Sequence, residues 1–181
     1  GAPVRVYACG GDGTLNEVVN GVQSFPNATV THYPCGSGND FIKLFSDPGA
    51  FHDLNRLIDG EASQFDLIRC QGDHYALNVC SMGFDARIGT SIGKYKRFPL
   101  LSGSGAYIVS TGVNLIKGIN RHYRVEMDDE TYEGSLAMIC IANGRWYGGG
   151  FNPVPEAEPD DGLLDVLIVK GVSRLTVANV I

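Results

Sequence analysis

Two glycine-rich loops, each placed between an expected strand and an expected helix, constrain the fold of this chain most strongly. The first loop, Gly10–Glu17, reads GGDGTLNE and follows the apolar run Pro3–Ala8. The second loop, Gly36–Asp40, reads GSGND and follows the run Thr29–Tyr33. Neighbouring parallel strands that end in such loops bring them together in one crevice at the carboxyl edge of the sheet. The pattern therefore predicts an α/β layer with a ligand crevice at that edge.

Helix-start patterns predict where the helices after these loops begin. Thr14 and Glu17 have the spacing of a capping box, so Thr14 is the expected N-cap of the first helix. Ser37 and Asp40 repeat that spacing before a second, short helix. A third helix is expected over Phe51–Asp59 and ends at a glycine.

After Gln64 the pattern changes to short strands, with a hairpin signal at Gly72-Asp73. The expected strands are Phe65–Cys70, Tyr75–Cys80, Arg121–Met127, Tyr132–Ala142 and Leu163–Lys170, and the expected helices are Asp85–Lys96, Ala106–Ile119 and Ser173–Ile181. We therefore expect an α/β domain over residues 1–63 and a strand-rich, β-sandwich-type domain over residues 64–181. Both ends of the chain are abrupt, which indicates an internal fragment with parts of both domains missing.

Composition narrows the kinds of ligand and compartment. With 44% hydrophobic and 19% charged residues, the 181-residue chain can bury a core. Its net charge of −6 argues against nucleic-acid binding, so a phosphate site has to be local. Five cysteines without a CxxC pair predict free, core-filling thiols in a reducing compartment, and four scattered histidines lack metal-ligand spacing. The sequence shows no apolar run of membrane-spanning length, so we expect a soluble protein with peripheral membrane contact at most.

The first loop combines an anion cradle with a carboxylate. Three glycines let the backbone approach a ligand, and the following helix N-terminus favours negative charge. Asp12 would repel a phosphate unless it helps to hold Mg²⁺ or an incoming hydroxyl group, which phosphoryl transfer requires. The alternative is a tight turn in which Asp12 caps its own backbone. The loop is neither a Walker A motif nor a GxGxxG motif.

Four segments in order resemble one family. GGDGTLNEVVNG followed by PCGSGNDF is similar to the catalytic signature of diacylglycerol kinases and their bacterial relatives, and more loosely to that of sphingosine and ceramide kinases. The segments Asn78–Ala86 (NVCSMGFDA) and Asn143–Val166 resemble later parts of the same family, so the similarity covers nearly the whole chain. GGDGT alone also occurs in NAD kinases and phosphofructokinases.

The resemblance implies a phosphofructokinase-like α/β nucleotide-binding domain, then a β-sandwich. It implies that ATP lies across the first loop. On general grounds such a transfer requires Mg²⁺, which neutralises charge on the transferring phosphoryl group. The implied nucleotide contacts are Gly10, Gly11, Asp12, Gly13, Thr14, Leu15, Asn16, Ser37 and Asn39. Asp161 corresponds to the family's proposed proton acceptor, although Asp160–Gly162 also reads as a type I turn. Lys117 stands near the place where some relatives use an aspartate for a subsidiary metal, so no metal ligand is assigned.

The resulting hypothesis is an ATP-dependent lipid kinase that phosphorylates a diacylglycerol-like hydroxyl group, in the cytoplasm or peripherally at the inner membrane face. The alternatives are an NAD kinase-like enzyme and a non-catalytic lipid- or nucleotide-binding module. Trp146 and Tyr147 are expected either against acyl chains or as a cap on the sandwich. Lys94, Lys96 and Arg97 form a basic cluster that either meets anionic head groups or is a solvated face. The sequence does not determine the oligomeric state, and we expect the 181 residues alone to transfer phosphate poorly.

Overall fold

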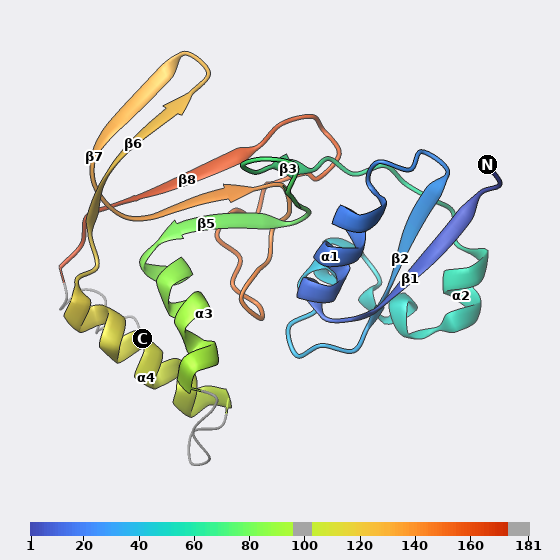
Figure 1. Ribbon diagram of the computed structural model, residues 1–181, viewed down its shortest axis with the longest axis horizontal. Coiled ribbons are helices and arrows are strands. Elements are labelled where there is room, and N and C mark those ends of the chain that lie inside the picture. The colour runs from blue at the N-terminus through green and yellow to red at the C-terminus, as the bar shows by residue number, and fades with distance from the viewer. Residues whose placement is uncertain (96–102, 174–181) are drawn as a thin grey trace. The chain divides into compact units, whose positions relative to one another are not determined.

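The computed structural model describes residues 1–95 and 103–173 and divides the chain into two compact units (Figure 1). The first unit is Gly1–Cys80 with Ile141–Asp165, and the second is Ser81–Cys140 with Val166–Ile181. The domain boundary predicted near residue 63 lies inside the first unit. The chain after residue 63 stays in the first unit because Phe65 and Leu67 pack against the same apolar core as the first helix.

The first unit is built on a β-α-β element. Strand β1 (Val4–Gly10) is followed by helix α1 (Asp12–Val22) and by strand β2 (Ala28–Pro34). The two strands pair in parallel, in a register that runs from Val4 opposite Ala28 to Gly10 opposite Pro34. Both glycine-rich loops therefore leave the same edge of this sheet, as the sequence predicts.

Helix α1 begins three residues earlier than the capping pattern predicts. Gly11 is the N-cap, with an extended backbone, and its carbonyl accepts the first helical hydrogen bond from the Leu15 N–H at 3.0 Å. Thr14 therefore lies within the first turn, and the predicted capping box is wrong. The side chain of Leu15 points into the apolar core with Ala8, Phe41 and Leu77.

The helices expected after the second loop are shorter than predicted. A 3₁₀ turn, η1 (Phe41–Leu44), follows Asp40, whose side chain makes no capping hydrogen bond, so the second predicted capping pair is also wrong. The helix expected over residues 51–59 is split into η2 (Pro48–His52) and α2 (Leu54–Asp59). The split occurs because Asp53 is extended, and its carboxylate accepts hydrogen bonds from the N–H groups of Asn55 and Arg56.

A short hairpin packs on α1 through two asparagine side chains. The strands β3 (Ile68–Arg69) and β4 (Tyr75–Ala76) are antiparallel, which confirms the predicted hairpin, but they are shorter than the expected strands. Asn20 donates to the Tyr75 carbonyl at 2.7 Å and accepts from the Tyr75 N–H at 2.8 Å. Asn16 accepts from the Leu77 N–H at 3.0 Å. Side chains of α1 thus satisfy backbone groups that a longer sheet would otherwise pair.

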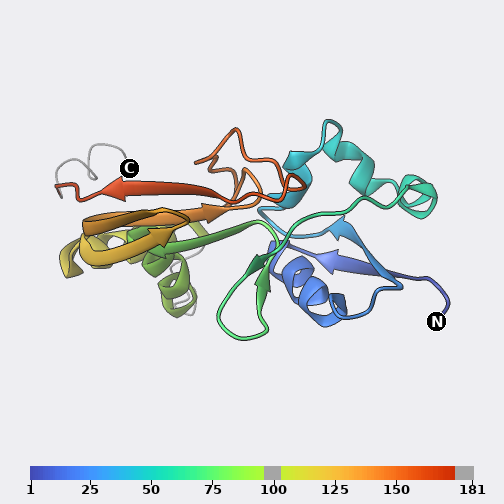
Figure 2. The same cartoon turned by 90° about the horizontal axis from the view of Figure 1, so that it is seen from above.

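The second unit is built on a four-stranded sheet with two helices. Its elements are α3 (Phe84–Tyr95), α4 (Gly103–Lys117), β6 (Arg121–Met127) and the greater part of β5 (Val79–Gly83), β7 (Glu130–Ala142) and β8 (Asp165–Lys170). The strand order is β5-β7-β6, and β8 also pairs with β7. Figure 2 shows both helices on one side of this sheet. Phe84 and Ile88 of α3 share an apolar cluster with Ala137 of β7 and Val169 of β8.

These elements confirm the predicted strands and helices of the second half to within a few residues. The helix expected from Ser173 onward and the charges of Lys96 and Arg97 fall outside the described residues. A polar seam joins α3 to α4, because the hydroxyl groups of Ser91 and Ser110 lie 2.6 Å apart and Asn114 donates to Ser91 at 2.9 Å. The seam satisfies polar groups that the helix pair buries.

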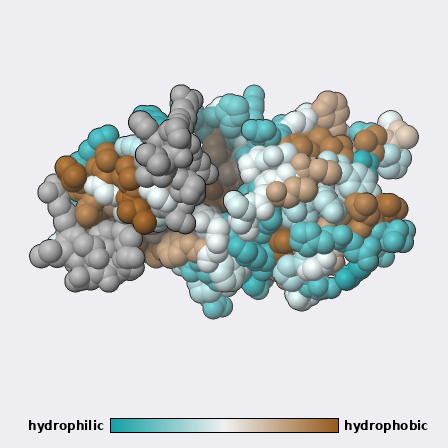
Figure 3. All heavy atoms as spheres, turned by 90° about the horizontal axis from the view of Figure 1, so that it is seen from below, coloured by the Kyte–Doolittle hydropathy of each residue, from teal (hydrophilic) through white to brown (hydrophobic). Residues whose placement is uncertain are grey.

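Several large apolar side chains reach the surface, and Figure 3 shows one face of the molecule on which they gather in patches. Among the described residues, the most exposed are Phe25, Ile58 and Leu163 in the first unit, and Ile108 and Ile116 in α4. Within residues 1–95 and 103–173, no helix combines the length and the apolar character that crossing a bilayer requires.

All five cysteines are free thiols, as predicted, but most do not fill the core. Only Cys140 is fully buried, whereas Cys9 and Cys35 are exposed and Cys70 and Cys80 are half-buried. The core-filling prediction is therefore wrong for Cys9 and Cys35. Both lie at the edge where the strands end, because Cys9 is the last but one residue of β1 and Cys35 directly follows β2. For Cys140, burial raises the pKa of the thiol to about 11, and the nearby Asp85 carboxylate adds to the shift.

We expect Cys140 to resist alkylation in the folded protein. With a pKa of about 11, about one Cys140 in a thousand is a thiolate at pH 8, against about one in four for an ordinary thiol. Iodoacetamide at pH 8, read by peptide mass spectrometry, should label Cys9 and Cys35 first and Cys140 only after unfolding in urea. Equal labelling rates for Cys35 and Cys140 in the native protein would contradict the burial.

We expect Asn20→Ala to lower the free energy of unfolding by about 1 to 3 kcal/mol, because it leaves the Tyr75 N–H without its side-chain partner and removes the shorter of the two amide bonds to the Tyr75 carbonyl, the other coming from Asn16. Urea unfolding followed by circular dichroism measures the change. Asn55→Ala is the matched control, because Asn55 is exposed on α2 and should change the same quantity by about 0.5 kcal/mol or less. Equal effects of the two substitutions would show that the Asn20 contacts contribute nothing to stability.

Candidate functional site

The two glycine-rich loops meet backbone to backbone. A β-carbon at Gly36 would lie 2.4 Å from the Gly11 α-carbon, and one at Gly11 would lie 3.2 Å from the Gly36 α-carbon. The Cys35 N–H donates to the Gly10 carbonyl at 2.8 Å and extends the β1–β2 pairing into the loops. Glycine is required at Gly36, because any side chain would push the loops apart.

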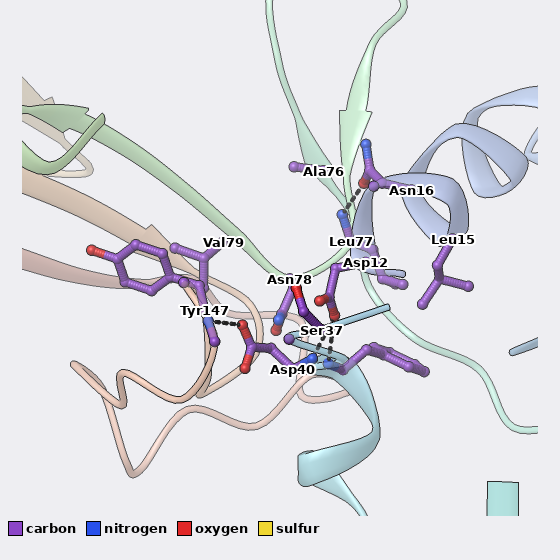
Figure 4. A pocket seen from close by; sticks show the side chains of 15 residues that line it. Asp12, Leu15, Asn16, Ser37, Asp40, Ala76, Leu77, Asn78, Val79 and Tyr147 are labelled. Atoms are coloured by element: carbon purple, nitrogen blue, oxygen red, sulfur yellow. Dashed lines mark hydrogen bonds between the residues drawn. The ribbon is translucent and has the colours of Figure 1, made fainter. Parts of the chain in front are cut away.

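Asp12 joins the first loop to the segment that follows the second. Its Oδ1 accepts hydrogen bonds from the Asp40 N–H at 2.6 Å and from the Phe41 N–H at 3.1 Å. Figure 4 shows this carboxylate turned toward Asp40, with both bonds drawn. Asp12 thus caps the start of η1 rather than its own turn, which corrects the turn alternative. Its Oδ2 has no hydrogen-bond partner among the described residues and lies beside Gly38, whose β-carbon would be 3.0 Å away.

The second loop is closed by its own asparagine. Asn39 accepts from the Gly36 N–H at 3.0 Å and donates to the Gly36 carbonyl at 2.8 Å. Its φ angle of 47° is in the left-handed region, which asparagine tolerates better than most residues. The side chain of Asn39 therefore shapes the loop, while Ser37 at the exposed tip faces the cavity described below.

Asp40 is a buried carboxylate that the sequence prediction did not include among the site residues. Its side chain is only 4% exposed; Oδ1 accepts from Lys43 Nζ at 2.5 Å, and Oδ2 accepts from the Gly149 N–H at 2.7 Å. Two partners compensate the cost of burying the charge. The sequence pattern GSGND assigns Asp40 only to a helix start, and no local pattern marks its contact with Gly149, which lies far along the chain.

The segment bound by Asp40 is a glycine loop whose backbone has positive φ angles. Gly148, Gly149 and Gly150 have φ angles of 67°, 90° and 127°, which residues with side chains rarely adopt. Tyr147 and Phe151 exchange two backbone hydrogen bonds of 2.9 Å, and their rings pack edge to face. The aromatic loop expected around Trp146 is therefore a small closed hairpin.

Two further segments that carried the family resemblance meet beside this loop. The Asn78 carbonyl accepts from the N–H groups of Asn143 and Gly144 at 2.9 and 2.8 Å. Asn78 Nδ2 donates to the Trp146 carbonyl, and Asn143 Nδ2 donates to the Leu77 carbonyl at 2.9 Å. Hydrogen bonds of the Asn78 and Asn143 side chains thus join residues 77–78 to residues 143–146.

These segments enclose a cavity of about 470 Å³ within the first unit (Figure 4). It is lined by Asp12, Gly13, Leu15, Asn16, Ser37, Gly38, Asp40, Phe41, Ala76, Leu77, Asn78, Val79, Tyr147, Gly148 and Gly149. Of the predicted nucleotide contacts, the structure brings together here Asp12, Gly13, Leu15, Asn16 and Ser37. The others, Gly10, Gly11, Thr14 and Asn39, shape the loops and do not line the cavity.

Several predicted contact residues have structural partners of their own. The Asn16 amide holds the backbone of Tyr75 and Leu77, and the Leu15 side chain is only 3% exposed. Thr14 lies against Gly10, where a β-carbon would come within 2.4 Å of the Thr14 hydroxyl oxygen. Their side chains position the loop, so any contact they make with a ligand would come chiefly from the backbone.

Asp161 lies in an exposed turn and does not line the cavity. Its Oδ1 accepts from the Leu163 N–H at 2.9 Å, a typical turn contact. Asp66 holds this segment, because its Oδ2 accepts from the Gly162 N–H and its own N–H donates to the Pro159 carbonyl, both at 2.7 Å. Within the described parts of the chain, no cluster of three or more His, Cys, Asp or Glu side chains could hold a metal ion.

Comparison with known protein families agrees with this architecture. Residues 2–70 match the model of the diacylglycerol kinase catalytic domain. Residues 78–181 match the model described as the YegS C-terminal NAD kinase beta sandwich-like domain, which covers more than half of the chain. The α/β part and the β-sandwich-like part expected from the sequence are both confirmed.

Individual relatives agree as well. The chain is 32% identical over 167 residues to a protein of Staphylococcus aureus strain Mu3 named "Putative lipid kinase", and 30% identical over 166 residues to one of the same name from Staphylococcus carnosus. These alignments cover 90% and 91% of this chain but 53% of each relative, so the chain spans about half their length. The crystal structure of a diacylglycerol kinase from Bacillus anthracis str. Sterne superimposes with a TM-score of 0.67 at 25% identity, over 97% of this chain and 57% of that one. The chain therefore belongs to the diacylglycerol kinase catalytic-domain family, with an α/β catalytic part followed by a YegS-type C-terminal β-sandwich-like domain.

Proposed function

We propose that the intact protein transfers the γ-phosphate of ATP to a lipid hydroxyl group, with a diacylglycerol-like acceptor. The observation that supports this most is the position of Asp12 at the junction of the two loops. One oxygen of its carboxylate is held by two backbone N–H groups, and the other is left for a ligand. Family membership supports the reaction class, and the lipid kinases among the relatives support the lipid acceptor.

The start of α1 is suited to bind phosphate oxygens. The first N–H groups of a helix have no partner within the helix, and the helix dipole favours an anion at that end. In α1 the first helical bond is donated by Leu15, so the N–H groups of Asp12, Gly13 and Thr14 are available. Gly13 lines the cavity and has no side chain to block an approaching phosphate.

Asp12 Oδ2 would hold Mg²⁺, which neutralises charge on the transferring phosphoryl group when it is bound. Protein sites for Mg²⁺ commonly supply one or two carboxylates and leave the other positions to water and phosphate oxygens. The carboxylates of the cavity fit coordination of Mg²⁺ by a single protein carboxylate. Asp12 Oδ2 accepts no hydrogen bond from the described residues, whereas both oxygens of Asp40 already have partners. The role of Asp40 is then to position the Gly148–Gly150 loop.

Asp161 is the proposed proton acceptor for the lipid hydroxyl, on the basis of the family resemblance. The Leu163 N–H orients its carboxylate through Oδ1, and Oδ2 has no hydrogen-bond partner within residues 1–95 and 103–173. A carboxylate that accepts a proton needs such a free oxygen. A lipid acceptor also implies peripheral contact with a membrane, so we propose that the intact enzyme works in the cytoplasm at the inner membrane face.

We expect Asp12→Asn to lower turnover about 100-fold or more in a radiolabelled ATP transfer assay with the full-length protein. Asparagine can keep the two hydrogen bonds to Asp40 and Phe41, so the fold should survive while the charge at Oδ2 is lost. Asp53→Asn is the matched control, because Asp53 also caps a helix through two N–H groups but does not line the cavity. It should leave turnover within about twofold of the parent protein.

We expect Asp161→Asn to lower turnover by about 100-fold as well, with an unchanged urea midpoint, if this carboxylate takes the proton. An unchanged rate would show that Asp161 only stabilises its turn and does not accept the proton. Unchanged rates in both the Asp12 and the Asp161 variants would assign the reaction to other residues. No transfer by the parent protein to any acceptor would favour a non-catalytic lipid- or nucleotide-binding module.

We expect diacylglycerol-like lipids to be the best acceptors in a panel that also contains sphingoid bases, other glycerolipids and NAD. The assay follows transfer from labelled ATP by the full-length protein, with the 181-residue chain run beside it, for which we expect a much lower rate. Phosphorylation of NAD but of no lipid would overturn the proposal in favour of an NAD kinase-like enzyme.

A further inference from the structure

Two cysteine thiols outside the candidate catalytic groups lie in contact. The Sγ atoms of Cys70 and Cys80 are 3.4 Å apart, and both residues are half-buried rather than enclosed in the core. A disulfide requires a separation of about 2.05 Å, so the two sulfur atoms need to approach by about 1.4 Å. Rotation of the two side chains can supply a shift of this size.

The β3–β4 hairpin is the reason why these residues meet. Cys70 directly follows β3, and its N–H donates to the His74 carbonyl at 2.8 Å across the turn at Gly72, whose φ is 75°. The chain then passes through β4 and returns so that Cys80, at the start of β5, lies beside Cys70. The ten-residue separation lacks the CxxC spacing by which sequence analysis recognises thiol pairs.

The other thiols have different surroundings. Cys140 is fully buried, and the raised pKa of its thiol disfavours the reactive thiolate. Cys9 and Cys35 are exposed at the edge where the glycine-rich loops begin. Those two serve as internal references for how fast an accessible thiol is oxidised.

We propose that Cys70 and Cys80 form an oxidisable dithiol, a modification site that closes to a disulfide in response to peroxide. The thiolate of one cysteine attacks the peroxide, the O–O bond breaks, and a sulfenic acid forms with release of water. The second thiol then attacks that sulfur, the S–O bond breaks, and a second water leaves as the S–S bond forms. The two thiols lose two electrons, and one hydrogen peroxide is reduced to two waters.

The disulfide would close a covalent ring over residues 70–80. That ring contains Ala76, Leu77, Asn78 and Val79, which line the candidate site, and Tyr75, which α1 holds through Asn20. A cross-link restricts the conformations that such a segment can adopt. Oxidation therefore acts on one wall of the cavity, without involving Asp12 or Asp40.

The test is chemical and needs no lipid substrate. The full-length protein is treated with hydrogen peroxide, remaining thiols are blocked with N-ethylmaleimide, and trypsin digestion is followed by mass spectrometry. No Lys or Arg lies between Cys70 and Arg87, so both cysteines fall in one tryptic peptide. That peptide should lose two hydrogens, carry no maleimide and recover both labels after reduction with dithiothreitol, before Cys9 or Cys35 is appreciably oxidised.

Cysteine variants distinguish disulfide formation by the pair from oxidation of one cysteine alone. In Cys70→Ser the remaining Cys80 should stop at sulfenic acid, and Cys35→Ser, the matched control, should leave formation of the internal disulfide unchanged. Hydrogen–deuterium exchange of the amides of residues 71–79 should slow about tenfold or more on oxidation of the parent protein, and should not change in Cys70→Ser. The proposal is overturned if both cysteines remain fully alkylatable after Cys9 and Cys35 are oxidised, if they pair with other cysteines, or if amide exchange is unaffected.

Discussion

The hydrogen bonds from the N–H groups of Asp40 and Phe41 to one oxygen of Asp12 organise the first unit. They join the loop after β1 to the turn after β2, where the approach of Gly11 and Gly36 leaves no room for side chains. A carboxylate that accepts two N–H bonds is held in one orientation. The cavity depends on this arrangement, because its other walls come from segments far away in the sequence.

Asparagine side chains perform a second structural task in this unit. Asn16, Asn20, Asn78 and Asn143 each donate to a backbone carbonyl of a segment far away in the sequence. A side-chain amide carries the same donor and acceptor groups as a peptide, so it can replace a strand neighbour. The short strands β3 and β4 are explained by these contacts, because the groups of Tyr75 and Leu77 are satisfied without a longer ladder.

The sequence predicted those features that local patterns determine. Apolar runs and turn residues predicted β6 with the observed bounds, Arg121–Met127. The glycine-rich loops predicted a crevice, and the structure has a cavity there. The helix caps were wrong, because the start of α1 depends on the extended backbone of Gly11 rather than on the Thr14 hydroxyl. The burial of Asp40 was not predictable, because its partner Gly149 lies 109 residues further along the chain.

One carboxylate serving two purposes has a thermodynamic consequence. A cation drawn to Asp12 Oδ2 would withdraw electron density from Oδ1, and so would alter the bonds that hold the start of η1. Cation binding at Asp12 then changes the stability of the turn over residues 40–44, and the stability of that turn changes the cation affinity by the same factor. Any ligand that tightens this turn should raise cation affinity by the same factor by which the cation raises affinity for that ligand.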